Sequence, residues 1–120
     1  MPKVLVVDDN PVDRRLASKC VEGEGMQAVF AENGREALEV IARELPDFVL
    51  TDLDMPEMNG LELVKATQKL YASIPVILMT AKGSEDIAAE ALQAGAASYV
   101  AKRNLNQRFK ESLVVALRMV

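Results

Sequence analysis

Five short apolar runs alternate with five segments of helical period along this chain, and this alternation constrains the fold more than any other feature. The runs are rich in Val, Ile, Leu and Phe, and they lie at residues 3–8, 27–31, 47–52, 75–80 and 97–101. Strands that alternate with helices are typical of a parallel sheet covered on both faces. With 120 residues, the chain is predicted to form one domain over residues 1–120.

The segments between the runs carry signals for helix N-termini. Asn33, Asn59 and Asn104 are each followed three residues later by Glu or Gln, the pattern of a capping box. Asn10 precedes Pro11, a residue that is favoured at the first helical position. Each signal stands a few residues past an apolar run, so we expect a helix to follow each strand closely.

The last segment has apolar residues at helical spacing. This spacing predicts one buried stripe and leaves Val114 or Val115 partly exposed. The stripe comprises Phe109, Leu113, Ala116, Leu117 and Val120.

The connections between the predicted strands are short. Such crossovers are right-handed, and ligands of open α/β sheets bind beyond the carboxyl ends of the strands. We therefore predict a flavodoxin-like (βα)5 fold, a doubly wound parallel five-stranded sheet of order 2-1-3-4-5. In this order one edge collects the polar residues that follow strands 1, 3, 4 and 5, namely Asp8, Asp9, Asp52, Thr80 and Lys102.

Asp52 is the most informative of these residues, because a carboxylate ends an apolar run and a loop with Pro56 and Gly60 follows at once. Singly, each polar residue has a plain explanation as a solvated loop, a capping hydroxyl or a surface charge. Together, three acids, a hydroxyl and an ammonium indicate a magnesium-dependent phosphoryl site. Mg²⁺ takes oxygen ligands and keeps several waters, and clustered carboxylates are unfavourable without a cation.

Composition excludes several other functions. No apolar run approaches a membrane span and the N-terminus lacks the layout of a signal peptide, so we expect a cytoplasmic protein without membrane contact. A net charge of −4 and a pI near 4.9 argue against nucleic-acid binding. The chain has no histidine, so a phosphohistidine has to come from another molecule or domain. The single Cys20 is expected to pack on a buried stripe with Leu16.

Four motifs resemble those of the receiver domain of bacterial two-component response regulators, including the single-domain chemotaxis type. The resemblance covers essentially the whole chain. The motifs are Val6-Val7-Asp8-Asp9-Asn10, Asp52-x-x-Met55-Pro56-x-Met58-Asn59-Gly60, Met79-Thr80-Ala81 and Tyr99-x-x-Lys102. Each is weak alone, and together in this order they are specific.

The resemblance implies a signalling domain that is not an enzyme in the ordinary sense, since it would catalyse only its own phosphorylation and dephosphorylation. Its phosphoryl donor would be a sensor histidine kinase or a histidine phosphotransfer protein. Its output would pass to a downstream effector protein or a fused output domain. The chain ends inside the last predicted helix without a stop signal, so the sequence does not decide whether an output domain belongs to it.

The resemblance also implies a role for each matching residue. Asp52 would be the phosphoacceptor and Lys102 would pair with a phosphoryl oxygen. Mg²⁺ would be bound by Asp9, Asp52 and the backbone carbonyl of Asp54, with Asp8 helping through water.

Further roles concern the switch and its duration. Thr80 would hydrogen-bond the attached phosphoryl group, and Tyr99 would then turn inward and change the surface of the fourth helix, fifth strand and fifth helix. Asp54 and Lys82 would flank the entrance to the site and tune the phosphate lifetime.

One position departs from the family, in which proline usually follows the lysine through a cis peptide. Here Arg103 and Asn104 follow Lys102. A cis bond before a residue other than proline costs ~2.5 to 4 kcal/mol, so we predict a trans Lys102–Arg103 bond. Asn104 would then cap the last helix directly.

Two alternative functions remain at this point. Asp52-Leu53-Asp54 superficially resembles the Asp-x-Asp motif of haloacid-dehalogenase-type phosphatases, although that family carries it on the first strand of a larger chain. A receiver-like interaction module that is never phosphorylated is the second alternative, but such modules typically lose a key residue. Arg14 and Arg15 are interpreted as a solvated helix face, with docking of a phosphodonor as the alternative.

Overall fold

The five strands form one parallel sheet in the order β2-β1-β3-β4-β5. The structure is a computed structural model that describes residues 2–81 and 85–118. The strands are β1 Lys3–Val7, β2 Gln27–Ala31, β3 Phe48–Asp52, β4 Val76–Thr80 and β5 Ser98–Ala101. The predicted flavodoxin-like fold and strand order are therefore confirmed, and four of the five predicted runs exceed the strands by a single residue.

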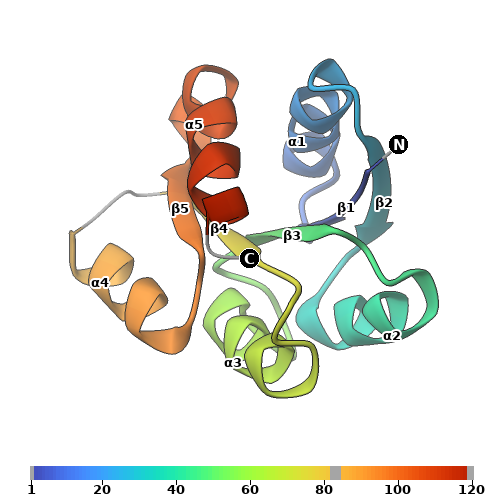
Figure 1. Cartoon of the computed structure of the whole chain (residues 1–120), viewed down its shortest axis with the longest axis vertical. Helices are drawn as coiled ribbons and strands as arrows, with labels where there is room; N and C mark the ends of the chain where they lie inside the picture. Colours follow the sequence, from blue (N-terminus) through green and yellow to red (C-terminus); the bar gives the residue numbers. More distant parts are fainter. Residues whose placement is uncertain (1, 82–84, 119–120) are drawn as a thin grey trace.

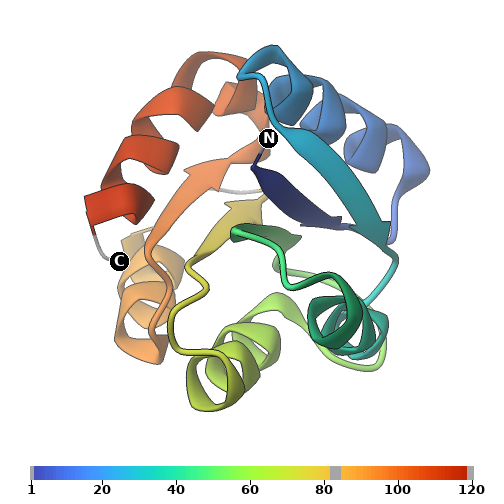
Figure 2. The same cartoon turned by 45° about the vertical axis from the view of Figure 1, so that its right-hand side comes forward.

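The helices lie on both faces of this sheet (Figure 1). They are α1 Pro11–Gly23, α2 Gly34–Glu44, α3 Gly60–Leu70, α4 Glu85–Ala94 and α5 Leu105–Arg118, with a 3₁₀ turn at Lys102–Asn104 before α5. Figure 2 shows α1 and α5 together on one face, while α2, α3 and α4 cover the other. Among the described residues, no helix has the length and hydrophobicity needed to cross a bilayer.

Strand β1 shows how the sequence fills both layers of core. Successive side chains of a strand point to opposite faces. Val4 and Val6 accordingly pack with the cluster under α1 and α5, and Leu5 and Val7 pack with the cluster under α2, α3 and α4. All four side chains are buried, so β1 is a central strand that fixes the position of whatever follows Val7.

Three of the predicted helix caps are present. Asn10 and Asn33 accept hydrogen bonds from backbone N–H groups in the first turns of α1 and α2. Asn59 forms a complete capping box with Glu62.

The cap predicted at Asn104 is wrong. The chain turns directly from Ala101 into the 3₁₀ turn, and the Leu105 N–H bonds back to the Lys102 carbonyl, so Asn104 already lies inside helical structure. The peptide bond between Lys102 and Arg103 is trans, as predicted, because no cis peptide occurs in the described part of the chain.

The buried stripe predicted for α1 is wrong at Leu16, although Cys20 does pack against the core under α1 and α5. Leu16 is 52% exposed and Cys20 is only half-buried, whereas Ala17 and Val21 are fully buried. The buried pair keeps the spacing of four residues but lies one residue later, which is about 100° around the helix. Cys20 also donates a hydrogen bond from Sγ to Asn106 Oδ1 at 3.2 Å and links α1 to α5.

The stripe predicted for α5 is confirmed where the side chains are described. Phe109 and Ala116 are buried and Leu113 packs against the same core. Val114 and Val115 are 43% and 44% exposed, as expected. The side chain of Leu117 and the whole of Val120 lie outside the described residues.

Candidate functional site

The carboxyl edge of the sheet brings the predicted residues together. Val7 pairs with Thr51 across β1 and β3, so Asp8 and Asp52 are the next residues along two adjacent strands. Thr80 pairs with Ala101 across β4 and β5, which places Lys102 immediately beyond that pair. These positions follow from strand register alone.

Lys102 lies at the centre of the site. Its Nζ atom is 2.8 Å from Asp8 Oδ2, 2.9 Å from Asp13 Oδ2 and 3.2 Å from Asp52 Oδ1. The lysine side chain is 18% exposed, so these contacts are partly shielded from solvent. The ammonium thus joins α1, β1, β3 and the turn after β5.

Three carboxylates form an acidic cluster beside this lysine. One oxygen from each of Asp8, Asp9 and Asp52 lies within 4.8 Å of the others. Asp8 and Asp52 are buried and Asp9 is exposed. Asp8 Oδ1 accepts a hydrogen bond from the Asn10 N–H at 2.9 Å, while the buried Oδ2 meets the lysine as an ion pair but accepts no hydrogen bond of good geometry.

This donor set fits Mg²⁺. The ion binds carboxylate oxygens through a few protein ligands and retains water, and Asp9 leaves one side of the cluster open to solvent. The Asp8 oxygen without a well-formed hydrogen bond faces the Lys102 ammonium at 2.8 Å, and one ammonium does not balance three carboxylates.

The raised pKa of Asp52 also favours a cation at this cluster. Burial, followed by the nearby charge of Asp8, raises the pKa of Asp52 to about 6. Lys102 and the Leu53 N–H, which donates to Asp52 Oδ1 at 2.9 Å, offset only part of this effect. An ionised Asp52 is therefore destabilised by its surroundings, and a bound cation would relieve it.

Lys102 remains a cation throughout the neutral range. Burial alone would lower its pKa, but the close contacts with the Asp8 and Asp13 carboxylates and the charge of Asp52 outweigh burial and raise the pKa above its ordinary value. The site thus holds a permanent positive charge against its acids.

Thr80 offers a hydroxyl without a partner. The residue is 1% exposed, and its Oγ1 has no hydrogen-bond partner among the described residues. Because a buried hydroxyl without a partner is unfavourable, this group is available to an incoming acceptor. Tyr99, on the neighbouring strand, is half-buried and packs against the core under α2, α3 and α4.

Of the two residues predicted to tune the phosphate lifetime, Asp54 is among the described residues and Lys82 is not. Asp54 is exposed and lies two residues past Asp52. Lys82 lies outside the described residues, so the predicted pairing of these two side chains stays a prediction.

Gly60 holds the loop after Asp52 close to the site. A Cβ at this position would collide with the Asp52 backbone carbonyl oxygen and would lie 2.9 Å from Leu53 Cα. The Gly60 N–H donates to the Leu53 carbonyl at 2.8 Å. Only glycine permits this approach.

Two contributions of α1 were not predicted. Asp13 contacts Lys102, and Arg14 donates from Nη1 to the Asp8 backbone carbonyl at 2.9 Å. Arg14 is therefore anchored to the site rather than simply solvated. The signal was the short link from Asp9 to Pro11, which puts the first turn of α1 directly beside the strand-end acids.

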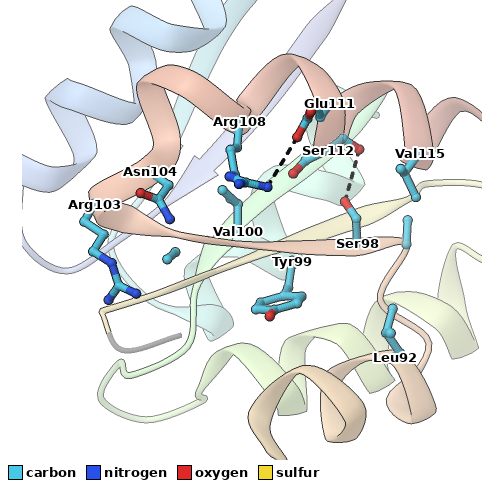
Figure 3. A pocket seen from close by; sticks show the side chains of 12 residues that line it. Leu92, Ser98, Tyr99, Val100, Arg103, Asn104, Arg108, Glu111, Ser112 and Val115 are labelled. Atoms are coloured by element: carbon cyan, nitrogen blue, oxygen red, sulfur yellow. Dashed lines mark hydrogen bonds and ion pairs between the residues drawn. The ribbon is translucent and has the colours of Figure 1, made fainter. Parts of the chain in front are cut away.

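A groove lies along β5 and α5 (Figure 3). It has a volume of about 500 Å³, and its lining includes Leu92 of α4 and Val115 of α5. Tyr99 and Ser98 extend from opposite sides of β5, and the Ser98 hydroxyl donates to the Ser112 carbonyl at 3.1 Å. The groove therefore reaches a residue of the predicted switch.

Comparison with known proteins agrees with this geometry. Residues 4–114 match the sequence model of a family described as response regulator receiver domain. Sporulation initiation phosphotransferase F of Bacillus subtilis is 39% identical over 100 residues, which cover 83% of this chain and 81% of that protein.

Two further similarities concern a larger regulator and a solved structure. DNA-binding transcriptional regulator NtrC of Escherichia coli is 40% identical over 99 residues, which cover 82% of this chain but 21% of that protein. This chain thus matches about a fifth of the length of that relative. The structure of chemotaxis protein CheY4 of Vibrio cholerae aligns with a TM-score of 0.87 at 30% identity, covering 97% of this chain and 98% of the other.

Proposed function

Because this chain belongs to the response regulator receiver domain family, we propose that it is a phosphoacceptor whose Asp52 receives a phosphoryl group from a phosphohistidine on a partner protein. The observation that carries the proposal is the position of Asp52. Its buried carboxylate lies between an acidic cluster suited to Mg²⁺ and the Lys102 ammonium, 3.2 Å away. Asp8 has the same two neighbours, but both of its oxygens are already engaged, Oδ1 by the Asn10 N–H and Oδ2 by Lys102 at 2.8 Å, whereas the described contacts of Asp52 involve Oδ1 alone.

The acidic cluster would hold the metal. Asp8, Asp9 and Asp52 supply carboxylate oxygens, and the backbone carbonyl of Asp54 is proposed as a further ligand. When bound, Mg²⁺ supplies positive charge for the oxygens of the transferring phosphoryl group. The Arg14 contact to the Asp8 carbonyl fixes the backbone that carries the first of these ligands.

Asp52 would act as the nucleophile. Its Oδ1 atom is held by the Leu53 N–H and by Lys102, which leaves Oδ2 to attack phosphorus. A bond forms between Oδ2 and phosphorus, the bond from phosphorus to the donor nitrogen breaks, and the donor imidazole leaves with that electron pair. Lys102 would stay close enough to pair with one phosphoryl oxygen, and the Thr80 hydroxyl would donate to another.

The dehalogenase-like phosphatase alternative is less well supported. In that reading Asp54 is the proton donor. Asp54 is exposed and makes no hydrogen bond or ion pair with the described residues. Turnover of a phosphomonoester would favour the phosphatase. A receiver instead accepts one phosphoryl group and then loses it to water.

The unphosphorylated module is also less well supported. A module without phosphoryl chemistry has no need for a buried threonine hydroxyl without a partner beside a lysine and three acids. We propose that Thr80 and Tyr99 form the switch, and that the groove of Figure 3 belongs to the surface that changes. An effector protein or a fused output domain would read that surface.

The phosphoryl donor would dock on α1. Val12 and Leu16 are large apolar residues, 65% and 52% exposed, on the helix that begins beside Asp9. An apolar surface next to the site is suited to a helix of a sensor kinase or a histidine phosphotransfer protein. A cytoplasmic location, where such a kinase presents its phosphohistidine, is part of this proposal, as is a phosphate lifetime set by Asp54 and Lys82.

Intact mass spectrometry after incubation with acetyl phosphate tests the proposal. We expect the mass of one phosphoryl group to appear with Mg²⁺ and to be absent after chelation of the metal. Asp52→Asn should prevent the addition, and Asp86→Asn, which removes an exposed acid of α4, should not. Equal labelling of Asp52→Asn and wild type would refute the assignment.

A further inference from the structure

Lys102 has a third carboxylate neighbour on a different element from the other two. Asp13 Oδ2 lies 2.9 Å from Lys102 Nζ, nearly the same distance as Asp8 Oδ2 at 2.8 Å. Asp8 and Asp52 lie at the ends of strands, whereas Asp13 belongs to the first turn of α1. A residue of the helix thus completes the set of acids around the ammonium.

Asp13 differs from the other acids in what else it can bind. The acidic cluster consists of Asp8, Asp9 and Asp52, and Asp13 is not among the carboxylates that approach one another there. The only described partner of the Asp13 side chain is Lys102. Asp13 is therefore free to hold the lysine whether or not a cation occupies the cluster.

The position of Asp13 is set by the helix cap. Its backbone N–H donates to Asn10 Oδ1 at 3.2 Å, so the residue is fixed at the start of α1. The Asp13 side chain is 37% exposed and that of Lys102 is 18% exposed. The contact is shielded enough to orient the ammonium, while Asp13 itself is exposed enough to be substituted without leaving a buried hole.

We propose that Asp13 is a positioning residue, which holds the Lys102 ammonium toward α1 and so leaves oxygens of Asp8 and Asp52 for Mg²⁺. This inference rests on the proposed function. An ammonium has three donors, and here three carboxylates surround it. If Asp13 became a neutral amide, the ammonium would lose one of its three charged partners and would pair more strongly with Asp8 and Asp52, the two buried acids that it already contacts and that a metal needs.

Two effects of that change act in the same direction. The lysine would compete more strongly with the metal for the same oxygens, and the site would carry one negative charge fewer. Both weaken the binding of a divalent cation.

The first test is a titration of the full chain with Mg²⁺. The amide chemical shifts of the loop after β1 and of Leu53 report the binding. For Asp13→Asn we expect the Kd for Mg²⁺ to rise about fivefold, the size of a unit charge acting on a divalent ion across several ångströms in water. The control is Glu32→Gln, which removes an exposed acid just after β2 at the same edge of the sheet. Its Kd should stay within about twofold of wild type. Equal Kd values for Asp13→Asn and Glu32→Gln would overturn the inference.

The second test needs neither metal nor phosphoryl donor. In the metal-free protein, the ¹H–¹⁵N signal of the Lys102 ammonium should be observable, because its carboxylate partners slow exchange with water. Asp13→Asn should shift or broaden this signal, and Glu32→Gln should leave it in place. An unchanged signal in Asp13→Asn would show that Asp13 does not position the lysine.

The two tests separate this inference from the proposed function. Wild-type protein that neither binds Mg²⁺ nor accepts a phosphoryl group would contradict the proposed function, and the ammonium signal would still decide whether Asp13 holds Lys102. Wild-type protein that binds Mg²⁺ no better than Asp13→Asn would contradict the inference alone.

Discussion

Lys102 Nζ lies 2.8 Å from Asp8 Oδ2, so a lysine that follows the last strand neutralises a fully buried carboxylate that follows the first. Removing one partner of a buried ion pair leaves the other charge without compensation, which is strongly destabilising. The contact therefore ties the stability of the fold to the chemistry of the site.

Lys102→Gln should lower the free energy of unfolding by about 2 to 4 kcal/mol in metal-free buffer at pH 7. Added Mg²⁺ should restore part of the loss, because a cation at the acidic cluster replaces the missing positive charge. Urea unfolding with and without Mg²⁺ measures both effects. Lys65→Gln, at an exposed site on α3, should change the free energy by less than about 0.5 kcal/mol. A Lys102→Gln protein as stable as that control would contradict the prediction.

Asp52→Asn should stabilise the metal-free protein at neutral pH. The pKa of Asp52 is raised from 3.8 to about 6 in the folded state, so the folded protein holds this proton more tightly than the unfolded chain. The resulting stability is fully present below pH 3.8 and is lost as the pH rises through about 6. The asparagine variant avoids that loss and should gain about 1 to 3 kcal/mol over wild type at pH 7.

Thermal or urea unfolding between pH 3.5 and 7 checks this dependence. The advantage of Asp52→Asn should grow across the interval, and Mg²⁺ should reduce it at pH 7 by favouring the ionised wild-type carboxylate. An advantage that is constant with pH would mean that the ionisation of Asp52 is not its cause. Asp86→Asn controls for the loss of one surface acid.

Gly60→Ala should damage both stability and labelling. The added Cβ would meet the Asp52 carbonyl oxygen and would lie 2.9 Å from Leu53 Cα, so the loop or the strand end has to shift. We expect a loss of about 2 kcal/mol or more in unfolding free energy and slower phosphorylation by acetyl phosphate.

Gly23→Ala is the matched control for that change. Nothing lies within 4 Å of a Cβ at Gly23, at the end of α1, so this variant should be neutral or gain about 0.5 kcal/mol. If the two glycine variants label at the same rate, the close approach of Gly60 has no bearing on the site.

Thr80→Val should separate stability from signalling. Valine matches the shape of threonine and removes a buried hydroxyl that has no partner, so the free energy of unfolding should stay the same or rise by up to about 1 kcal/mol. The hydroxyl that would reach the phosphoryl group is lost.

Amide shifts after addition of beryllofluoride and Mg²⁺ give the readout for Thr80. Wild type and Thr80→Ser should show changes at Tyr99 and along α5, and Thr80→Val should not. Changes at Tyr99 of wild-type size in Thr80→Val would show that the switch does not pass through this hydroxyl.

Much of the fold and most of the site could be predicted because parallel strands are buried on both faces. Runs such as Val4 to Val7 cannot be mistaken for loops, and the carboxyl ends of such strands meet at one edge. The order of the strands then brings Asp8, Asp52 and Lys102 together without any knowledge of side-chain positions.

The errors arose where local pattern does not determine which side of a helix is buried. Leu16 and Cys20 have helical spacing, yet the neighbouring pair Ala17 and Val21 faces the sheet, because the way α1 leaves β1 sets its rotation. Asn104 has the sequence of a cap but lies inside the turn that begins at Lys102. Asp13 was missed for a related reason, since its role depends on how the first turn of α1 faces a lysine 89 residues away.

The most direct test of the account is to identify the phosphorylated side chain chemically. An acyl phosphate on an aspartate is reduced by borohydride to the alcohol, which leaves homoserine at that position, whereas free carboxylates are not reduced. After incubation with acetyl phosphate and Mg²⁺, reduction and peptide sequencing by mass spectrometry should find homoserine at position 52, with Asp8, Asp9 and Asp54 unchanged. Homoserine at one of those three positions with an intact Asp52, or none anywhere, would contradict the claim that Asp52 is the phosphoacceptor.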